Sequence, residues 1–71
     1  MTFDYSKLRG RICEKFRTNA NFCRALDITE QSLSGKLTNK NGFSQEDIIK
    51  YIELLSIPLE ELHLYFFQVE H

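Results

Sequence analysis

A helix-start signal that occurs three times in 71 residues most constrains the fold of this chain. Each copy has a polar capping residue, Asp4, Thr29 or Ser44, with an apolar residue directly before it and another four residues after it. Such a capping side chain accepts a hydrogen bond from the first turn of a helix, and the two apolar residues pack together across the cap. Ser44 and Asp47 also have the spacing of a capping box. The chain is therefore predicted to be a series of short helices.

Apolar periodicity extends this prediction to five helices. In the first, apolar residues recur at the spacing of one helix face. Thr18 is predicted to cap the second helix, and Pro58 has a favourable place in the first turn of the last. Leu59, Leu62 and Phe66 are expected on the buried face of the last helix. The predicted helices cover about residues 5–16, 19–26, 30–37, 45–55 and 58–67, which makes the fold class all-α.

Length and composition indicate one small domain over residues 1–71. Phe3 to Phe16 mixes apolar and charged residues, so no secretory signal is expected. No apolar run approaches the roughly 18 residues of a membrane span. Cys13 and Cys23 have neither metal-site nor Cys-x-x-Cys spacing, and both are expected to be small core residues of a reduced protein. A cytoplasmic protein without contact to a membrane is the expectation.

Charge is divided unevenly along the chain. Residues 1–41 have eight Lys or Arg and four acidic residues, a balance of +4. Residues 42–71 have one Lys and six acidic residues, a balance of −5. This division favours one face that attracts an anionic partner and another that repels it, although charges of this kind also simply solvate helix surfaces.

Residues 19–37 have the pattern of a helix-turn-helix, two short helices joined by a tight turn. The first helix must cross the second closely, so the crossing needs compact apolar residues. The expected anchors are Phe22, Cys23, Ile28 and Leu33. The second helix is otherwise polar, as expected for a helix that enters the DNA major groove, which is about 12 Å wide.

Four stretches of this chain resemble a family of phage regulators. Asn19 to Leu33 resembles the motif of Cro/repressor-type proteins. Phe3 to Leu8, Ile57 to Glu61 and Tyr65 to Phe67 are similar to small switch proteins of temperate phages of Gram-positive bacteria, including Cro-like proteins and modulator-of-repression antirepressors. The resemblance implies a compact bundle of about five helices with the lambda-repressor-like fold, and a role in the choice between lysis and lysogeny. It also implies that the protein acts in the cytoplasm of a bacterial host cell.

The chain departs from the family pattern at two positions of the motif. Cys23 replaces the usual Ala, and Asp27 replaces the usual Gly of the turn. Asp tolerates a left-handed backbone better than most residues, so the turn is expected to survive.

The outward face of the second helix supplies the predicted binding residues. Its helical positions place outward Glu30, Gln31, Ser32, Ser34, Gly35 and Lys36. Gln31, Ser32 and Ser34 are candidates for base contacts. The candidates for phosphate contacts are Lys36, Asn39, Lys40, Arg17 and Arg24. Gly35 is expected to leave a bare patch, and the helix has no Arg for the commonest guanine contact.

Two functions remain open at this point. The first is a Cro-type regulator that opposes the lysogenic repressor by binding operator DNA, as a homodimer if the apolar residues 62–69 are a dimer surface rather than core. The alternative is an antirepressor that binds the repressor's DNA-binding domain and blocks its access to DNA. The motif and the basic half favour the first. The acidic half, Glu30 and Gly35 favour the second.

An enzyme is not expected. His63 and His71 have no Ser, Cys or paired carboxylate at a recognisable spacing, and the chain has no glycine-rich phosphate loop. The expectation is therefore no catalytic residue, no cofactor, no metal and no small-molecule substrate.

Overall fold

The computed structural model describes residues 2–70, so Met1 and His71 lie outside it. It consists of helices: α1 (Ser6–Phe16), α2 (Asn19–Leu26), α3 (Glu30–Leu37), α4 (Gln45–Leu55), the 3₁₀ helix η1 (Leu59–Glu61) and α5 (Leu62–Phe66). Over these residues the predicted all-α bundle is confirmed. None of the helices within residues 2–70 is long and apolar enough to cross a membrane.

Three predicted helix caps are present. Thr18, Thr29 and Ser44 each accept, through the side-chain oxygen, a 3.1 Å hydrogen bond from the backbone N–H three residues ahead. The capping box at α4 is complete, because the Asp47 carboxylate accepts a 3.1 Å bond from the Ser44 N–H. These contacts satisfy N–H groups that a helix start leaves unpaired.

The predicted cap at Asp4 is wrong. Tyr5 stands at the N-cap position of α1 and makes no side-chain cap bond. Asp4 lies one residue further out, where its carboxylate accepts a 2.9 Å bond from the Ser6 N–H and another from the Ser6 hydroxyl. These two hydrogen bonds hold the pKa of Asp4 below its ordinary value.

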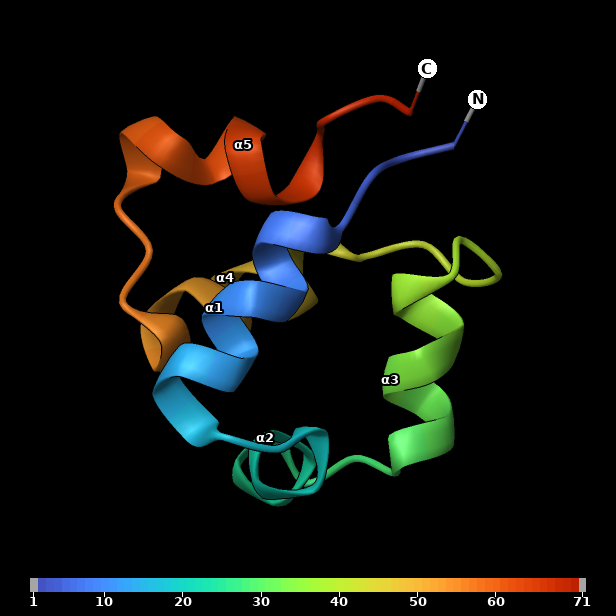
Figure 1. The fold of residues 1–71 in the computed structure, drawn as a ribbon, viewed down its shortest axis with the longest axis vertical. Coiled ribbons are helices and arrows are strands. Elements are labelled where there is room, and N and C mark those ends of the chain that lie inside the picture. Colours follow the sequence, from blue (N-terminus) through green and yellow to red (C-terminus); the bar gives the residue numbers. More distant parts are fainter. Residues whose placement is uncertain (1, 71) are drawn as a thin grey trace.

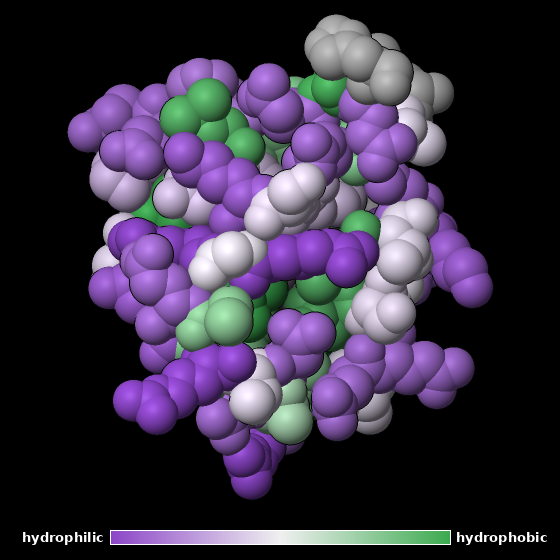
Figure 2. Space-filling view, viewed as in Figure 1, coloured by the Kyte–Doolittle hydropathy of each residue, from purple (hydrophilic) through white to green (hydrophobic). Residues whose placement is uncertain are grey.

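Helix α1 lies at the centre of the molecule and packs against α2, α4 and α5, whereas α3 lies at one edge (Figure 1). The side chains between the helices form one core. Its buried members are Tyr5, Leu8, Ile12, Phe22, Cys23, Leu33, Leu37, Tyr51, Leu55, Ile57, Tyr65 and Phe66. On the face of the molecule that Figure 2 shows, hydrophilic side chains predominate, and hydrophobic ones appear as smaller patches among them.

Helices α2 and α3 form the predicted two-helix motif. Asp27 has the expected left-handed conformation at the turn, with φ 60° and ψ 47°. The Ile28 N–H closes the turn by donating a 3.0 Å hydrogen bond to the Cys23 carbonyl. Of the predicted anchors, Phe22, Cys23 and Leu33 are buried, while Ile28 is half-buried.

Two expectations about buried residues are wrong. Cys13 is exposed, because the face of α1 that is buried is centred on Leu8 and Ile12. Leu59 is 74% exposed, because the chain after Pro58 first forms the short η1 helix and begins α5 only at Leu62.

The C-terminal segment closes part of the core. Tyr65 and Phe66 of α5 are buried, but Phe67 and Val69 remain exposed. The chain then pairs with the N-terminal segment through an antiparallel bridge between Phe3 and Val69. Residues 2–3 consequently lie beside residues 69–70 (Figure 1).

Candidate interaction surface

The outer face of α3 is the first part of the candidate surface. Helix α3 lies at the edge of the bundle with no other element on its outer side (Figure 1). Glu30, Gln31 and Ser34 are exposed on it, and Ser32 is half-buried. The structure therefore exposes two of the three predicted base-reading residues to solvent, together with an acidic side chain.

Gly35 is not on this face, contrary to the sequence-based expectation. It is buried and points towards the Asn41 side chain, which folds back over α3. A Cβ atom at Gly35 would overlap the Asn41 side-chain amide, so this side chain would have to move. The loop after α3 therefore uses the space that the glycine leaves.

Lys36 also turns away from the expected surface. Its ammonium forms an ion pair with Asp47 of α4 at 2.7 Å and donates a 3.3 Å bond to the Gly42 carbonyl. Only 15% of the Lys36 side chain is exposed, against 29% of the Asp47 side chain. Burial raises the pKa of Asp47, but hydrogen bonds from Lys36 and Ser44 outweigh it and lower the pKa overall. The charge of Lys36 is thus already paired within the fold.

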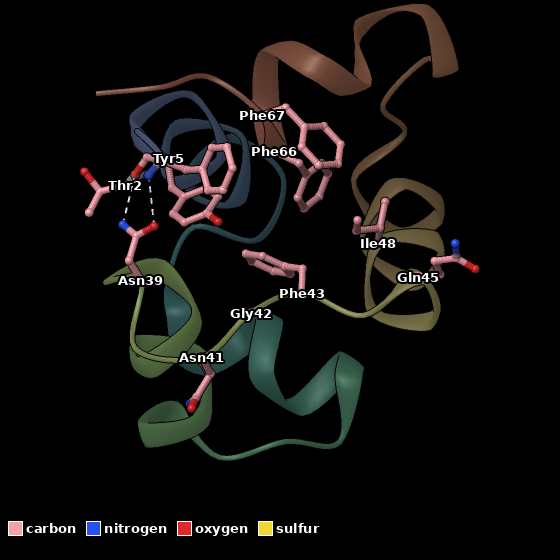
Figure 3. A pocket seen from close by; sticks show the side chains of 11 residues that line it. Thr2, Tyr5, Asn39, Asn41, Gly42, Phe43, Gln45, Ile48, Phe66 and Phe67 are labelled. Carbon is pink, nitrogen blue, oxygen red and sulfur yellow. Dashed lines mark hydrogen bonds between the residues drawn. The ribbon is translucent and has the colours of Figure 1, made fainter. Parts of the chain in front are cut away.

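Asn39 binds the N-terminal segment instead of presenting its amide to solvent. Its side-chain oxygen accepts a 2.9 Å bond from the Phe3 N–H, and its amide nitrogen donates a 3.0 Å bond to the Phe3 carbonyl (Figure 3). Asn39 has a positive φ of 67°, which Asn tolerates better than most residues. The predicted phosphate contact at this position is therefore a link between the N-terminus and the end of α3.

Two arginines of α1 bind the ends of other helices. Arg9 donates a 3.1 Å bond to the carbonyl of Leu37, the last residue of α3. Arg11 donates a 2.8 Å bond to the carbonyl of Leu55, the last residue of α4, and a 2.9 Å bond to that of Ser56. Cations at helix C-termini satisfy free carbonyls and offset the helix dipole. Part of the positive charge of the first half therefore stabilises the bundle.

The remaining predicted cations are exposed but do not gather in one place. Arg17 directly follows α1, and Arg24 lies on α2, where it has a hydrogen bond to Asn21. Lys40 lies beyond the C-terminal end of α3, which is the end away from α2 in the sequence. Together with the exposed Glu30, this arrangement leaves the outer face of α3 without a concentrated positive charge.

A polar hollow of about 220 Å³ adjoins the outer face of α3. Hydroxyl, amide and ammonium groups surround it, and the buried Gly35 backbone is at its base. Its lining residues are Gln31, Ser34, Gly35, Thr38, Lys40 and Asn41. Gln31, Ser34 and Lys40 from the predicted site are brought together here.

An aromatic groove of about 480 Å³ begins where α3 ends. Asn41 lines both the polar hollow and this groove, so the two are neighbours on the surface. Aromatic rings from three separated parts of the chain line it, with Ile48 of α4 (Figure 3). The rings are those of Phe3, Tyr5, Phe43, Phe66 and Phe67. Phe67, half of whose surface is exposed, leaves apolar area accessible at this groove.

Phe43 is the hub of the groove. Its ring lies edge-on to those of Tyr5, Tyr51 and Phe66, with centroids 5.3, 5.2 and 5.2 Å away. Aromatic pairs favour this geometry. The groove was not predicted from the sequence. Its only sequence signal was the apolar C-terminal segment, which offers more hydrophobic surface than one helix can bury.

Nothing in residues 2–70 indicates a reactive centre. No group of three His, Cys, Asp or Glu side chains in this part of the chain could hold a metal ion. Cys23 is buried, and burial, with a contribution from Glu30, raises the pKa of its thiol. Since the thiolate is the reactive form, Cys23 is an inert core residue. His63 is exposed, and His71 lies outside the described residues.

Comparison with known proteins supplies the family. No curated protein matches the chain. A solved structure, the solution structure of the modulator of repression (MOR) of the temperate bacteriophage TP901-1 from Lactococcus lactis, matches with a TM-score of 0.82 and 35% sequence identity. The match covers 99% of this chain and 97% of that one, so the two proteins share the whole fold. The family model described as "Protein of unknown function (DUF739)" matches residues 1–69, and the chain therefore belongs to the DUF739 family.

Proposed function

We propose that this protein is a phage antirepressor that binds the DNA-binding domain of a repressor and blocks its access to operator DNA. The similarity over the full length to a phage modulator of repression carries this proposal. A protein that modulates repression acts on a repressor or on its operator. The surface of this chain favours the repressor.

The outer face of α3 is poorly equipped to bind DNA. Lys36, the single cation of α3, is paired with Asp47. Glu30 is exposed at the N-terminal end of α3, the helix that would enter the major groove of DNA. Affinity for DNA depends on cations that neutralise phosphates. Because Lys36 is not free to contact phosphates, the Cro-type interpretation is weakened, although the motif alone favours it.

A repressor's DNA-binding face offers complementary chemistry. Such a face is basic because it binds phosphates, and it presents polar side chains that otherwise contact base edges. Residues 42–71 of this chain have a balance of −5, and Glu46, Glu53, Glu60 and Glu70 are exposed. Opposite charges steer two proteins together and exclude wrong partners.

The proposed contact surface combines the polar hollow with the aromatic groove. The hollow supplies hydroxyl and amide groups for polar side chains of the repressor. The groove receives an apolar side chain, because apolar residues that fill a pocket give most of the affinity in protein interfaces. Asn41 lines both, so the hollow and the groove are neighbours, and in our proposal one helix of the repressor spans them.

Retardation of an operator duplex tests the proposal. The probe is the operator of a helix-turn-helix repressor encoded in the same genome, with and without that repressor. We expect this protein alone to leave the duplex unretarded at two salt concentrations, and to release it from the repressor. Retardation by this protein alone that weakens with salt would instead support a Cro-type regulator.

Two variants locate the surface in the same assay. Phe67→Ala removes an exposed groove side chain and is expected to raise the concentration needed for release about tenfold, as for a residue that contributes strongly to an interface. Leu59→Ala is the matched control, since Leu59 is exposed but does not line the groove. Equal effects of the two variants would place the contact elsewhere.

A further inference from the structure

Lys36 contacts both Phe43 and the residue directly before it. Its ammonium donates a 3.3 Å hydrogen bond to the carbonyl of Gly42, the residue before Phe43. It also lies 5.6 Å from the centroid of the Phe43 ring, within range of a cation–π contact. One side chain of α3 thus contacts both the backbone before this aromatic residue and the ring itself.

Asp47 extends this hold to the residue after Phe43. The carboxylate oxygen that pairs with Lys36 at 2.7 Å also accepts the 3.1 Å bond from the Ser44 N–H. The Asp47 N–H in turn donates to the Ser44 hydroxyl. Gly42 and Ser44 are therefore both anchored to one ion pair, which we call the Lys36–Asp47 clasp.

The clasp matters because of where Phe43 lies. Phe43 belongs to the loop between α3 and α4, which contains Asn39 and Gly42, but its ring is central to the aromatic groove. A shift of this ring would move it relative to Tyr5 and Phe66, which lie edge-on to it in the same groove. The shape of the groove consequently depends on how the loop is held.

We propose that Lys36 is a positioning residue, which fixes Phe43 through the Lys36–Asp47 clasp and so sets the affinity of the groove for an apolar side chain of the partner. The proposal rests on the proposed function for its partner, a repressor's DNA-binding domain. It gives Lys36 a role without contact to DNA or to the repressor. Lys36, which the sequence predicts to contact phosphate, instead influences the recognition of a protein.

A double-mutant cycle tests this role. The variants are Lys36→Met, which keeps the apolar stem and removes the charge, Phe43→Leu, and the two combined, each titrated against the repressor's DNA-binding domain. Lys36→Met should weaken binding about tenfold in the normal protein, within the range for coupled neighbours, and should have little effect once Phe43 is replaced. Equal effects in both backgrounds would overturn the proposal.

Two further variants separate positioning from charge. Lys36→Arg keeps a cation that can pair with Asp47 and should retain most of the affinity. Lys15→Met removes an exposed charge of α1 that lines neither the hollow nor the groove, and should change binding little. If Lys15→Met weakens binding as much as Lys36→Met, the effect is one of general charge and the proposal is wrong.

A measurement on the free protein keeps the test independent of the partner. In NMR spectra, Lys36→Met should shift the ring resonances of Phe43 and leave the protein folded, whereas Lys15→Met should leave these resonances in place. Unchanged Phe43 resonances in Lys36→Met would refute the clasp even if the repressor binds. Failure of the normal protein to bind any repressor, with the shifts present, would refute the proposed function alone.

Discussion

The ammonium of Lys36 on α3 lies 2.7 Å from a carboxylate oxygen of Asp47 on α4. This ion pair joins the helix that would read DNA to the helix that follows it. It removes the charge of Lys36 from the outer face of α3 and anchors the loop around Phe43. One contact between residues eleven positions apart thus changes the expected use of the motif.

The ion pair predicts a pH dependence of stability. The pKa of Asp47 is lowered in the folded protein, so its contribution is fully present above the unfolded value of about 3.9 and is lost as the pH falls through the lower folded value. Asp47→Asn should therefore lose less free energy of unfolding than the normal protein between pH 5 and the acid limit of folding. Urea unfolding at several pH values measures this. Glu46→Gln, at an exposed neighbouring position, is the control, and parallel pH curves for Asp47→Asn and the normal protein would contradict the prediction.

Gly35→Ala should stabilise the protein, although Gly35 is buried. Ala is favoured over Gly within a helix by about 1 kcal/mol. The new Cβ would meet only the flexible side chain of Asn41, which can rotate away. Gly10→Ala in α1 is the matched control, because a Cβ there meets nothing. We expect both variants to raise the free energy of unfolding in urea, Gly35→Ala by the smaller amount. A loss of stability in Gly35→Ala alone would show that Asn41 cannot move.

Tyr51→Phe should leave the protein as stable or make it more stable by about 1 kcal/mol. The Tyr51 side chain is 1% exposed, and its hydroxyl has no hydrogen-bond partner within residues 2–70. Burial, followed by Asp47 and Cys23, raises the pKa of this phenol. In the unfolded chain the Tyr51 phenol ionises above about pH 10, and this lowers the stability of the normal protein. Tyr51→Phe has no phenol at this position and should keep that stability. Thermal unfolding at pH 7 and pH 10.5 measures both effects, and a clear loss at pH 7 would reveal a partner for the hydroxyl.

Asn39→Gly should loosen the N-terminal segment. Glycine keeps the positive φ at little cost, but it loses the two hydrogen bonds to Phe3. The expected loss is about 1–2 kcal/mol of unfolding free energy, with faster hydrogen exchange at the Phe3 amide. Asn41→Ala is the control, since the Asn41 side chain is exposed. Unchanged exchange at Phe3 in Asn39→Gly would mean that other contacts hold the segment.

The sequence predicts the helices well because their signals are local. The caps at Thr18, Thr29 and Ser44 and the left-handed turn at Asp27 depend on residues within one helical turn. The cap at Asp4 failed by one residue, which is the usual precision of a helix boundary. Local chemistry therefore specifies most of this fold.

The surface was harder to predict because it depends on contacts between distant residues. The orientation of Lys36 follows from Asp47, and that of Asn39 follows from Phe3, which lies 36 residues earlier in the chain. With apolar residues only at Leu33 and Leu37, α3 gives a weak indication of which face is buried. The aromatic groove unites both ends of the chain with the loop before α4, and no single stretch of sequence contains it.

Calorimetric titration compares the two possible partners most directly. The purified protein is titrated with the DNA-binding domain of the repressor and, in the same buffer, with the operator duplex. We expect saturable binding to the domain, weakened by Phe67→Ala but not by Leu59→Ala, and no binding to the duplex. Saturable binding to the duplex, with none to the domain, would contradict the proposal that this protein acts on the repressor rather than on DNA.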